Sequence, residues 1–331
     1  MKKSALLFAV LGGGSAQIAL AQSSTTIYGV ADMGFVFENG SAAGSVTKLT
    51  SGVGYGSRLG FKGIEDLGGG MSAKYVLEAG ILMDTGASAQ GGILFGRQSY
   101  VGLSGAPGSV TLGRQYTPYY WTLFTLVDPF GTGYAGTATN LMANPGRANN
   151  MVLYTTPTIG GVTGELSYSV GEVAGNITAS RATGGSLGYV NGPFVIKLTF
   201  NNAANATGTD NAKNVLLGGT YNFGPVKLHA AYAQNKGLGT TNTQDGLIGV
   251  TVPIGANRIL ASYVVKNDRS IANRDAHQFG LGYVYSVSKR TELYTAYAHI
   301  SNKNGATYTV GNGTELGSGN SAFNLGMRHF F

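Results

Sequence analysis

Apolar and polar residues alternate along most of this 331-residue chain, and this period of two limits its fold more than any other feature. Successive side chains of a β-strand point to opposite faces, so alternation predicts strands with one apolar and one polar face. Apolar members of these runs include Ile27, Phe35, Tyr75, Leu77, Leu166, Tyr168, Ile196, Leu198, Leu228, Tyr232, Tyr263, Leu281, Leu325 and Met327. Helical periodicity is almost absent between them, so we expect an all-β protein.

The composition narrows the class further. Charged residues make up only 11% of the chain, whereas soluble domains carry about 25%. No run of 18 apolar residues is present, which excludes a helical membrane protein. The 19 tyrosines and 14 phenylalanines exclude a disordered chain, and the absence of cysteine excludes disulfide scaffolds, thiol chemistry and zinc fingers.

The first 21 residues are predicted to be a cleaved signal peptide. Lys2 and Lys3 form a basic start, residues 5–11 form a short apolar core, and Ala19-Leu20-Ala21 is a cleavage site of the A-x-A type. Removing these 21 residues leaves 310 of the 331 and lowers the formal net charge from +7 to +5, since two lysines are lost. The mature chain, residues 22–331, is therefore expected to be exported.

Short and long connections follow each other between the alternating runs. Short ones are rich in Gly and Pro, as at 106–108 and 191–193, which is typical of tight turns. Long ones cover residues 39–54, 116–145, 202–213, 235–244 and 301–320. Tight turns at one end and long loops at the other are typical of a transmembrane β-barrel.

The predicted architecture is an antiparallel barrel of sixteen strands. Sixteen strands in 310 residues allow about 19 residues for each strand with its connection, while one span needs roughly 9–11 residues. Fourteen or eighteen strands remain possible at this point. A soluble β-sandwich is disfavoured, because its outer faces would carry charges and a chain of this length would divide into domains.

Several segments resemble the general trimeric porins of the Gram-negative outer membrane, particularly those of beta-proteobacteria. The resemblance follows the mature chain in order, and no single segment carries it alone. The segments are STTIYGVAD (24–32), SRLGFKGIEDLGGG (57–70), FGRQSYVGLSG (95–105), LGRQ (112–115), RANNMVLY (147–154), LGYVY (281–285), SKRT (288–291) and GMRHFF (326–331).

The resemblance implies an outer-membrane homotrimer of sixteen-stranded barrels, in which the third external loop folds inward and narrows each pore. That loop corresponds to residues 116–146, which hold seven aromatic residues and, before Arg147, a single charge, Asp128. Such a segment is poorly suited to solvent, so packing against the inner wall is expected. The terminal Phe331 resembles the signal read by the outer-membrane assembly machinery.

The resemblance also implies a set of pore-lining residues. Arg58, Arg97 and Arg147 match the arginine cluster on the pore wall opposite the loop, and Asp128 is the expected acidic counterpart. Arg97 has the same parity as the apolar residues Val101 and Leu103, so either a bulge intervenes between them or that wall lies at a subunit contact. Lys62, Lys74 and Glu78 lie on the polar faces of their strands and are expected to face the lumen. Arg114 is expected to point outward.

Enzymatic and nucleic-acid functions find little support. The G-x-S-x-G pattern at Gly184–Gly188 lies in an alternating run, whereas a nucleophile elbow needs a strand-to-helix turn. The four histidines lack metal-ligand spacing, and the basic residues are too dispersed for nucleic-acid binding. We therefore expect no cofactor and no metal.

The function expected from these observations is passive diffusion of small hydrophilic solutes and ions through the outer membrane, with a weak preference for anions. Two alternatives remain open. One is a channel selective for a sugar or a carboxylate, which an aromatic track along the lumen would favour. The other is an outer-membrane hydrolase, for which no Ser/His pair on adjacent lipid-facing positions is found in the sequence.

Overall fold

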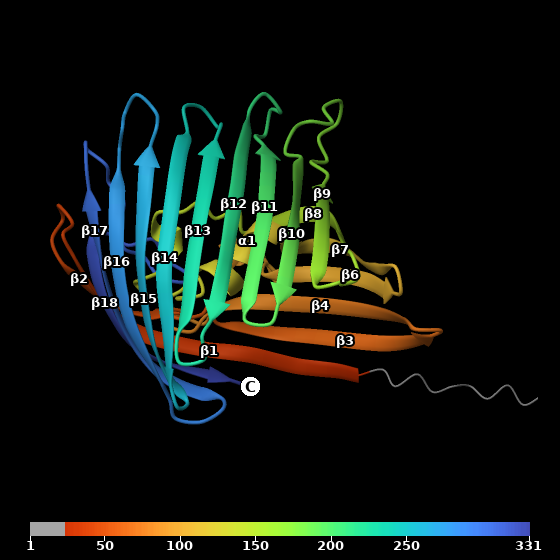
Figure 1. Cartoon of the computed structure of the whole chain (residues 1–331), viewed down its shortest axis with the longest axis horizontal. Helices are drawn as coiled ribbons and strands as arrows, with labels where there is room; N and C mark the ends of the chain where they lie inside the picture. The colour runs from red at the N-terminus through yellow and green to blue at the C-terminus, as the bar shows by residue number, and fades with distance from the viewer. Residues whose placement is uncertain (1–23) are drawn as a thin grey trace, which may run out of the picture.

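A computed structural model describes residues 24–331, which form one antiparallel sheet that closes on itself (Figure 1). The sheet closes where β1 pairs with β18, in a register running from Val30–Phe330 to Asn39–Ser321. Its strands are β1 (Ser24–Asn39), β2 (Val46–Ser51), β3 (Arg58–Gly68), β4 (Met71–Leu82), β5 (Ala87–Ser88), β6 (Gln98–Gly105), β7 (Gly108–Tyr116), β8 (Arg147–Thr155), β9 (Val162–Ser169), β10 (Ala182–Asn191), β11 (Phe194–Ala204), β12 (Asn211–Asn222), β13 (Lys227–Lys236), β14 (Asn242–Ile254), β15 (Asn257–Asp268), β16 (Ala276–Ser286), β17 (Thr291–Asn302) and β18 (Ser321–Phe330).

These segments make a barrel of sixteen strands, which confirms the predicted number. β2 and β3 pair with successive parts of β1 and so form two pieces of one strand. β5 is a two-residue addition to the end of β4. The expected signal peptide, residues 1–21, lies outside the described residues.

Residues 39–54 were expected to form a loop, but β2 lies within them and extends the wall. The register pairs Val46 with Glu38 and Thr47 with Phe37. Val46-Thr47-Lys48-Leu49 itself alternates and carries β-branched residues, which favours a strand. The prediction was wrong here because the run is only six residues long.

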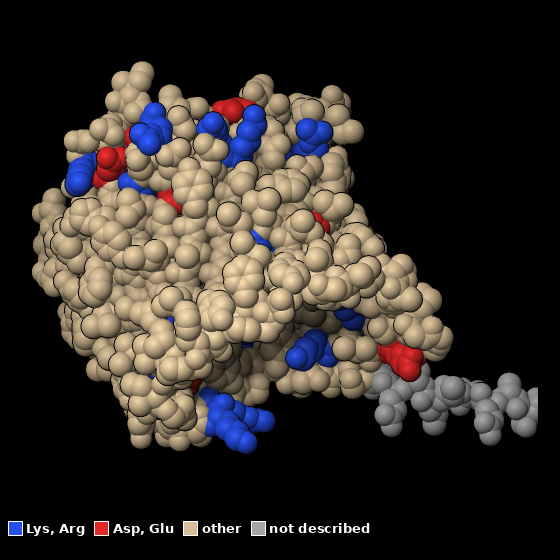
Figure 2. Space-filling view, in the orientation of Figure 1, with Lys and Arg blue, Asp and Glu red and all other residues tan. Residues whose placement is uncertain are grey.

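The alternation observed in the sequence becomes an outer and an inner face. On β18, Leu325 and Met327 are about half exposed on the outside, whereas Asn324 and Arg328 are buried inside. On the face seen in Figure 2, charged side chains gather at the upper and lower edges and the band between them carries few. An apolar band of this kind suits contact with lipid.

No helix in residues 24–331 has the length and apolar character needed to cross a membrane.

The connection between β7 and β8 fills part of the barrel interior. It contains the helical turns α1 (Pro118–Thr122), η2 (Leu123–Val127) and η3 (Ala138–Asn140). Thr117 caps α1, because its hydroxyl accepts a hydrogen bond from the Tyr120 N–H at 3.1 Å. α1 contacts β9, β10, β11 and β12 and lies behind the last two in Figure 1. We call residues 117–146 the inner loop.

Apolar side chains fix the inner loop to the far wall. Phe130 is 1% exposed, and its ring lies on Gly280 and Gly282 of β16. A Cβ atom at these two positions would come within 3.2 and 2.9 Å of the ring, so the close approach depends on glycine. Gln278 Nε2 on the same strand donates to the carbonyls of Gly136 and Thr137 at 3.1 and 3.0 Å. The inner loop is therefore held by both packing and hydrogen bonds.

Candidate pore constriction

A cavity of about 970 Å³ lies between the inner loop and the wall formed by β3, β4 and β6. We call it the eyelet cavity. Its lining includes four cationic side chains, those of Arg58, Lys62, Arg97 and Arg147, and two carboxylates, those of Glu78 and Glu315. The cations come from three places in the sequence, β3, the segment before β6 and the start of β8, which the barrel register brings together.

Arg97 reaches the cavity because the chain bends immediately before β6. Its own N–H donates to the Glu78 carbonyl at 3.1 Å. Its Nε donates to Glu78 Oε1 at 2.8 Å, and its Nη2 donates to the Tyr116 hydroxyl at 2.6 Å. The parity of Arg97 was expected to reflect either a bulge or a subunit contact. The structure supports a local irregularity of the chain, since the alternation of β6 begins only at Gln98.

Arg58 and Arg147 have no carboxylate partner among residues 24–331. Arg58 Nε donates to the Gly56 carbonyl at 3.0 Å. The Arg147 guanidinium carbon lies 4.2 Å from the centre of the Tyr116 ring, and its Nη2 donates to the Tyr116 hydroxyl. These two guanidinium groups are thus held by neutral groups and form no ion pair of their own.

The residues expected to line the lumen have different surroundings. Glu78 is buried and accepts hydrogen bonds from Arg97 and from the Tyr28 hydroxyl, the latter at 2.9 Å. Lys62 Nζ lies 5.1 Å from the centre of the Tyr28 ring. Lys74 has the same parity as Glu78 but pairs with Ile64 and Gly102, and it does not line the eyelet cavity.

Asp128 does not face the arginines, which corrects the expectation from the sequence. Its carboxylate is 4% exposed and accepts hydrogen bonds from the backbone N–H groups of Phe130, Thr132 and Ala138, each at 2.9 Å. A buried carboxylate needs such donors, and the inner loop itself supplies them. Asp128 therefore holds the inner loop in shape, and the cavity lining includes no acid from this loop.

Neither Arg114 nor Phe331 lines the eyelet cavity. Arg114 sits at a register shift in β7, where its Nε donates to the Gly96 carbonyl at 2.7 Å and its Nη1 donates to Asn149. Phe331 follows β18 and exchanges backbone hydrogen bonds with Gly29 of β1, at 3.0 and 3.2 Å. The last residue thereby contributes to barrel closure.

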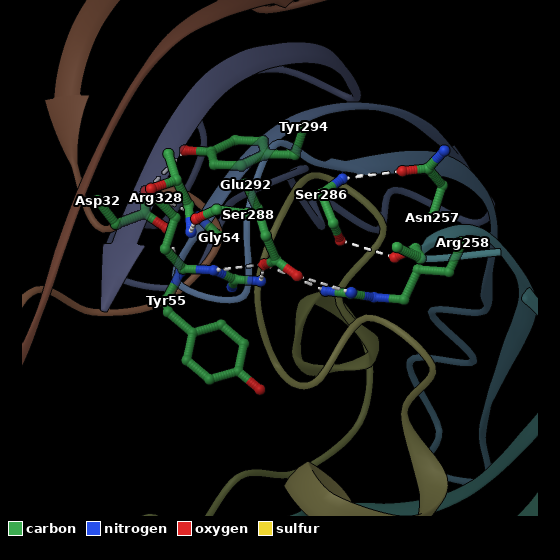
Figure 3. A network of polar contacts seen from close by, with 12 residues as sticks. Asp32, Gly54, Tyr55, Asn257, Arg258, Ser286, Ser288, Glu292, Tyr294 and Arg328 are labelled. Atoms are coloured by element: carbon green, nitrogen blue, oxygen red, sulfur yellow. Dashed lines mark hydrogen bonds and ion pairs between the residues drawn. The ribbon is translucent and has the colours of Figure 1, made fainter. Parts of the chain in front are cut away.

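A buried polar network beside the cavity was not predicted from the sequence (Figure 3). Glu292 pairs with Arg258 at 2.8 Å and with Arg328, which is 2% exposed. The Arg328 guanidinium carbon lies 4.3 Å from the centre of the Tyr55 ring. Alternation could have placed Arg328 on the inner face, because Arg328 has the opposite parity to Leu325 and Met327. These two residues lie on the apolar outer face of the same strand. Glu315 was also missed, and it pairs with Lys48 at 2.9 Å.

Metal and nucleophile sites find no support in the described part of the chain. No group of three or more His, Cys, Asp or Glu side chains in residues 24–331 could hold a metal ion. The G-x-S-x-G segment lies within β10, and the Ser186 hydroxyl donates to Glu165, which pairs with Lys197 at 2.7 Å. A strand interior does not provide the turn that a nucleophile elbow requires.

Comparison with known proteins agrees with this geometry. A family model described as Gram-negative porin matches residues 5–305. Outer membrane porin protein 32 of Delftia acidovorans is 35% identical over the full length of both chains. An outer membrane porin protein of Bordetella pertussis is 33% identical, again over the full length of both.

Solved structures give the same result. An anion-selective porin from Comamonas acidovorans superposes with a TM-score of 0.83 at 33% identity, over 94% of this chain and 100% of that one. OmpF of Salmonella typhi, at 16% identity and a TM-score of 0.70 over 93% and 97% of the two chains, shares the fold. The chain therefore belongs to the Gram-negative porins and is an outer-membrane β-barrel that forms a water-filled channel for passive diffusion of small hydrophilic solutes.

Proposed function

We propose that this channel prefers anions and that Arg58, Arg97 and Arg147, together with Lys62, set the preference at the eyelet cavity. The observation that carries the proposal is the charge balance of the lining, four cations against two carboxylates. Both carboxylates are already paired, Glu78 with Arg97 and Glu315 with Lys48. The solved porin from Comamonas acidovorans is described as anion-selective, which supports the same direction.

The physics favours a modest preference over strict selectivity. Guanidinium groups stay charged at any relevant pH, and low-dielectric walls focus their field across a narrow aqueous gap. Salt screens that field, since the Debye length is about 8 Å at physiological ionic strength. The preference should therefore weaken as the salt concentration rises. Lys74 and Asp128 have no part in this proposal, because neither side chain faces the arginines.

The inner loop is proposed to narrow the channel, and the protein to act as a homotrimer. Support for the narrowing of the channel comes from the buried contacts of the inner loop with β16 and from its place beside the eyelet cavity.

We further propose that residues 1–21 are cleaved on export and that Phe331 is read by the assembly machinery. N-terminal sequencing of protein from outer membranes should begin at Gln22, and an uncleaved Met1 would contradict this.

The test of ion preference is the reversal potential of the purified channel in a planar lipid bilayer under a KCl gradient. We expect a potential displaced towards the chloride equilibrium value at low salt and a smaller displacement at high salt. A displacement towards the potassium value at low salt would overturn the proposal.

A further inference from the structure

A column of aromatic rings borders the eyelet cavity. The rings of Tyr116, Tyr120 and Phe124 lie parallel, with centroids 4.5 and 5.7 Å apart and interplanar angles of 9° and 7°. Tyr55, from the segment between β2 and β3, meets Phe124 edge-on at 5.5 Å. Trp121 lies beside the column, 5.1 Å from Tyr116 and 5.5 Å from Phe124. All five side chains line the cavity.

Helical spacing explains how the column forms. Tyr120 and Phe124 are four residues apart in the helical turns α1 and η2, where residues at this spacing lie on one side, and Tyr116 ends β7 two residues before α1. Tyr116 is buried, whereas Tyr55, Tyr120, Trp121 and Phe124 keep part of their surface exposed to the cavity. The column therefore offers ring surface to a solute, in addition to packing the inner loop.

Arginines lie at both ends of the column. Arg97 and Arg147 are 6.0 and 4.2 Å from the centre of the Tyr116 ring. Arg58 is 5.6 Å from the centre of the Tyr55 ring. Within the described residues 24–331, the terminal nitrogens of Arg58 donate to no protein group, and the buried Nε of Arg147 also has no partner. Donors for an anionic group thus lie next to flat apolar surface.

We propose that the eyelet cavity binds planar aromatic carboxylates of the benzoate class, with the carboxylate on Arg58 or Arg147 and the ring against Tyr120, Trp121 or Phe124. The inference rests on the proposed anion preference and names a solute class for the same site. Arginine forms paired hydrogen bonds with a carboxylate, and offset or edge-on ring contacts add to the energy of area burial. A cavity of about 970 Å³ is large enough for such a solute.

The charge, the size and the aromatic ring of such a solute can be tested separately by choice of probe. Chloride and acetate use the arginines alone. Cyclohexanecarboxylate has the charge and nearly the size of benzoate but no aromatic face. If the column recognises rings, benzoate should reduce the KCl current through the channel in a saturable way, at concentrations about 2- to 10-fold lower than cyclohexanecarboxylate. Acetate should reduce it least.

The experiment measures this block on the full protein in planar bilayers, with all probes as potassium salts at constant ionic strength. Phe124→Leu and Trp121→Leu remove ring surface from the cavity, and each should lower the difference between benzoate and cyclohexanecarboxylate. Phe223→Leu is the matched control, since Phe223 is 59% exposed in the turn between β12 and β13. It should leave the block by benzoate unchanged.

The outcomes separate this inference from the function on which it rests. Equal block by benzoate and cyclohexanecarboxylate in the unmodified channel overturns the inference, even where the reversal potential shows anion preference. A reversal potential displaced towards potassium overturns the proposed function first. Because the comparison of probes uses the unmodified protein, it decides the question even if a variant fails to fold.

Discussion

The Nε–H of Arg97 donates to Oε1 of Glu78 over 2.8 Å, and the two side chains are only 7% and 2% exposed. This ion pair offsets much of the charge of Arg97, one of the three arginines proposed to set the anion preference. Most of the excess positive charge of the eyelet cavity therefore resides on Arg58, Arg147 and Lys62. Glu78 thus limits the field that an anion meets in the channel.

Replacing Glu78 by Gln should strengthen the anion preference. Gln keeps a hydrogen-bond acceptor for Arg97 but removes the negative charge, so Arg97 adds to the field. We expect the reversal potential at low KCl to move further towards the chloride value. Glu65→Gln, an identical change at an exposed position of β3, is the control and should have a smaller effect. An unchanged reversal potential in Glu78→Gln, or a shift towards potassium, would mean that the pair of Glu78 and Arg97 does not act on the permeating ions in this way.

Replacing Arg58 by Glu should shift the preference towards cations by more than the same change elsewhere. Arg58 has no carboxylate partner among residues 24–331, so the change reverses a free charge at the cavity. Arg290→Glu, in the exposed turn between β16 and β17, alters the net charge equally at a mouth of the channel. If both variants give the same reversal potential, net charge and not the eyelet cavity sets selectivity.

The strands could be predicted from the sequence because one rule, a period of two with an apolar outer face, applies at nearly every position of the wall. Leu325 and Met327 face outward and Arg328 inward for this reason alone. The wall residues Arg58, Lys62 and Glu78 follow the same rule. All three line the eyelet cavity.

The rest of the site could not be predicted because it depends on irregular backbone. Arg97 enters the cavity through a bend that parity does not reveal. Asp128 was expected to face the arginines as the one acid of the inner loop, yet its position is decided by three N–H groups of the folded loop, at Phe130, Thr132 and Ala138. The aromatic residues of this loop were visible in the sequence, but their stacking requires the helical turns of α1 and η2.

Deleting residues 130–139 should raise the single-channel conductance. This segment includes Phe130, which lies on Gly280 and Gly282, and the carbonyls that accept from Gln278. Its removal takes volume out of the barrel interior. Deleting residues 206–208 from the external connection between β11 and β12 is the control and should leave the conductance unchanged. An unchanged conductance in both, with ready proteolysis of the intact inner loop, would place that loop outside the pore.

Replacing Glu292 by Gln should destabilise the barrel. Arg328 is 2% exposed, and Glu292 is its partner while also pairing with Arg258. Removing one member of a buried ion pair leaves a charge in a poorly solvated place and costs about 3–5 kcal/mol. The measurement is the temperature at which the β-sheet circular dichroism signal is lost in detergent. The exposed change Glu65→Gln should leave that temperature unaltered, and equal values for the two variants would contradict the prediction.

A native mass of three chains is expected after extraction in mild detergent. The outer wall at β6 to β8 carries polar groups that lipid does not accommodate well: the hydrogen bond between Arg114 and Asn149 is exposed, next to the paired outward residues Leu112 and Val152. An arginine facing lipid near the bilayer midplane costs about 2–4 kcal/mol. Contact with another copy would remove that cost, and the glycines of this wall allow close approach.

Replacing Arg114 by Ala should weaken the assembly without changing the reversal potential, because Arg114 does not line the eyelet cavity. A native mass of a single chain for the unmodified protein would show that this wall faces lipid and that the homotrimer does not form.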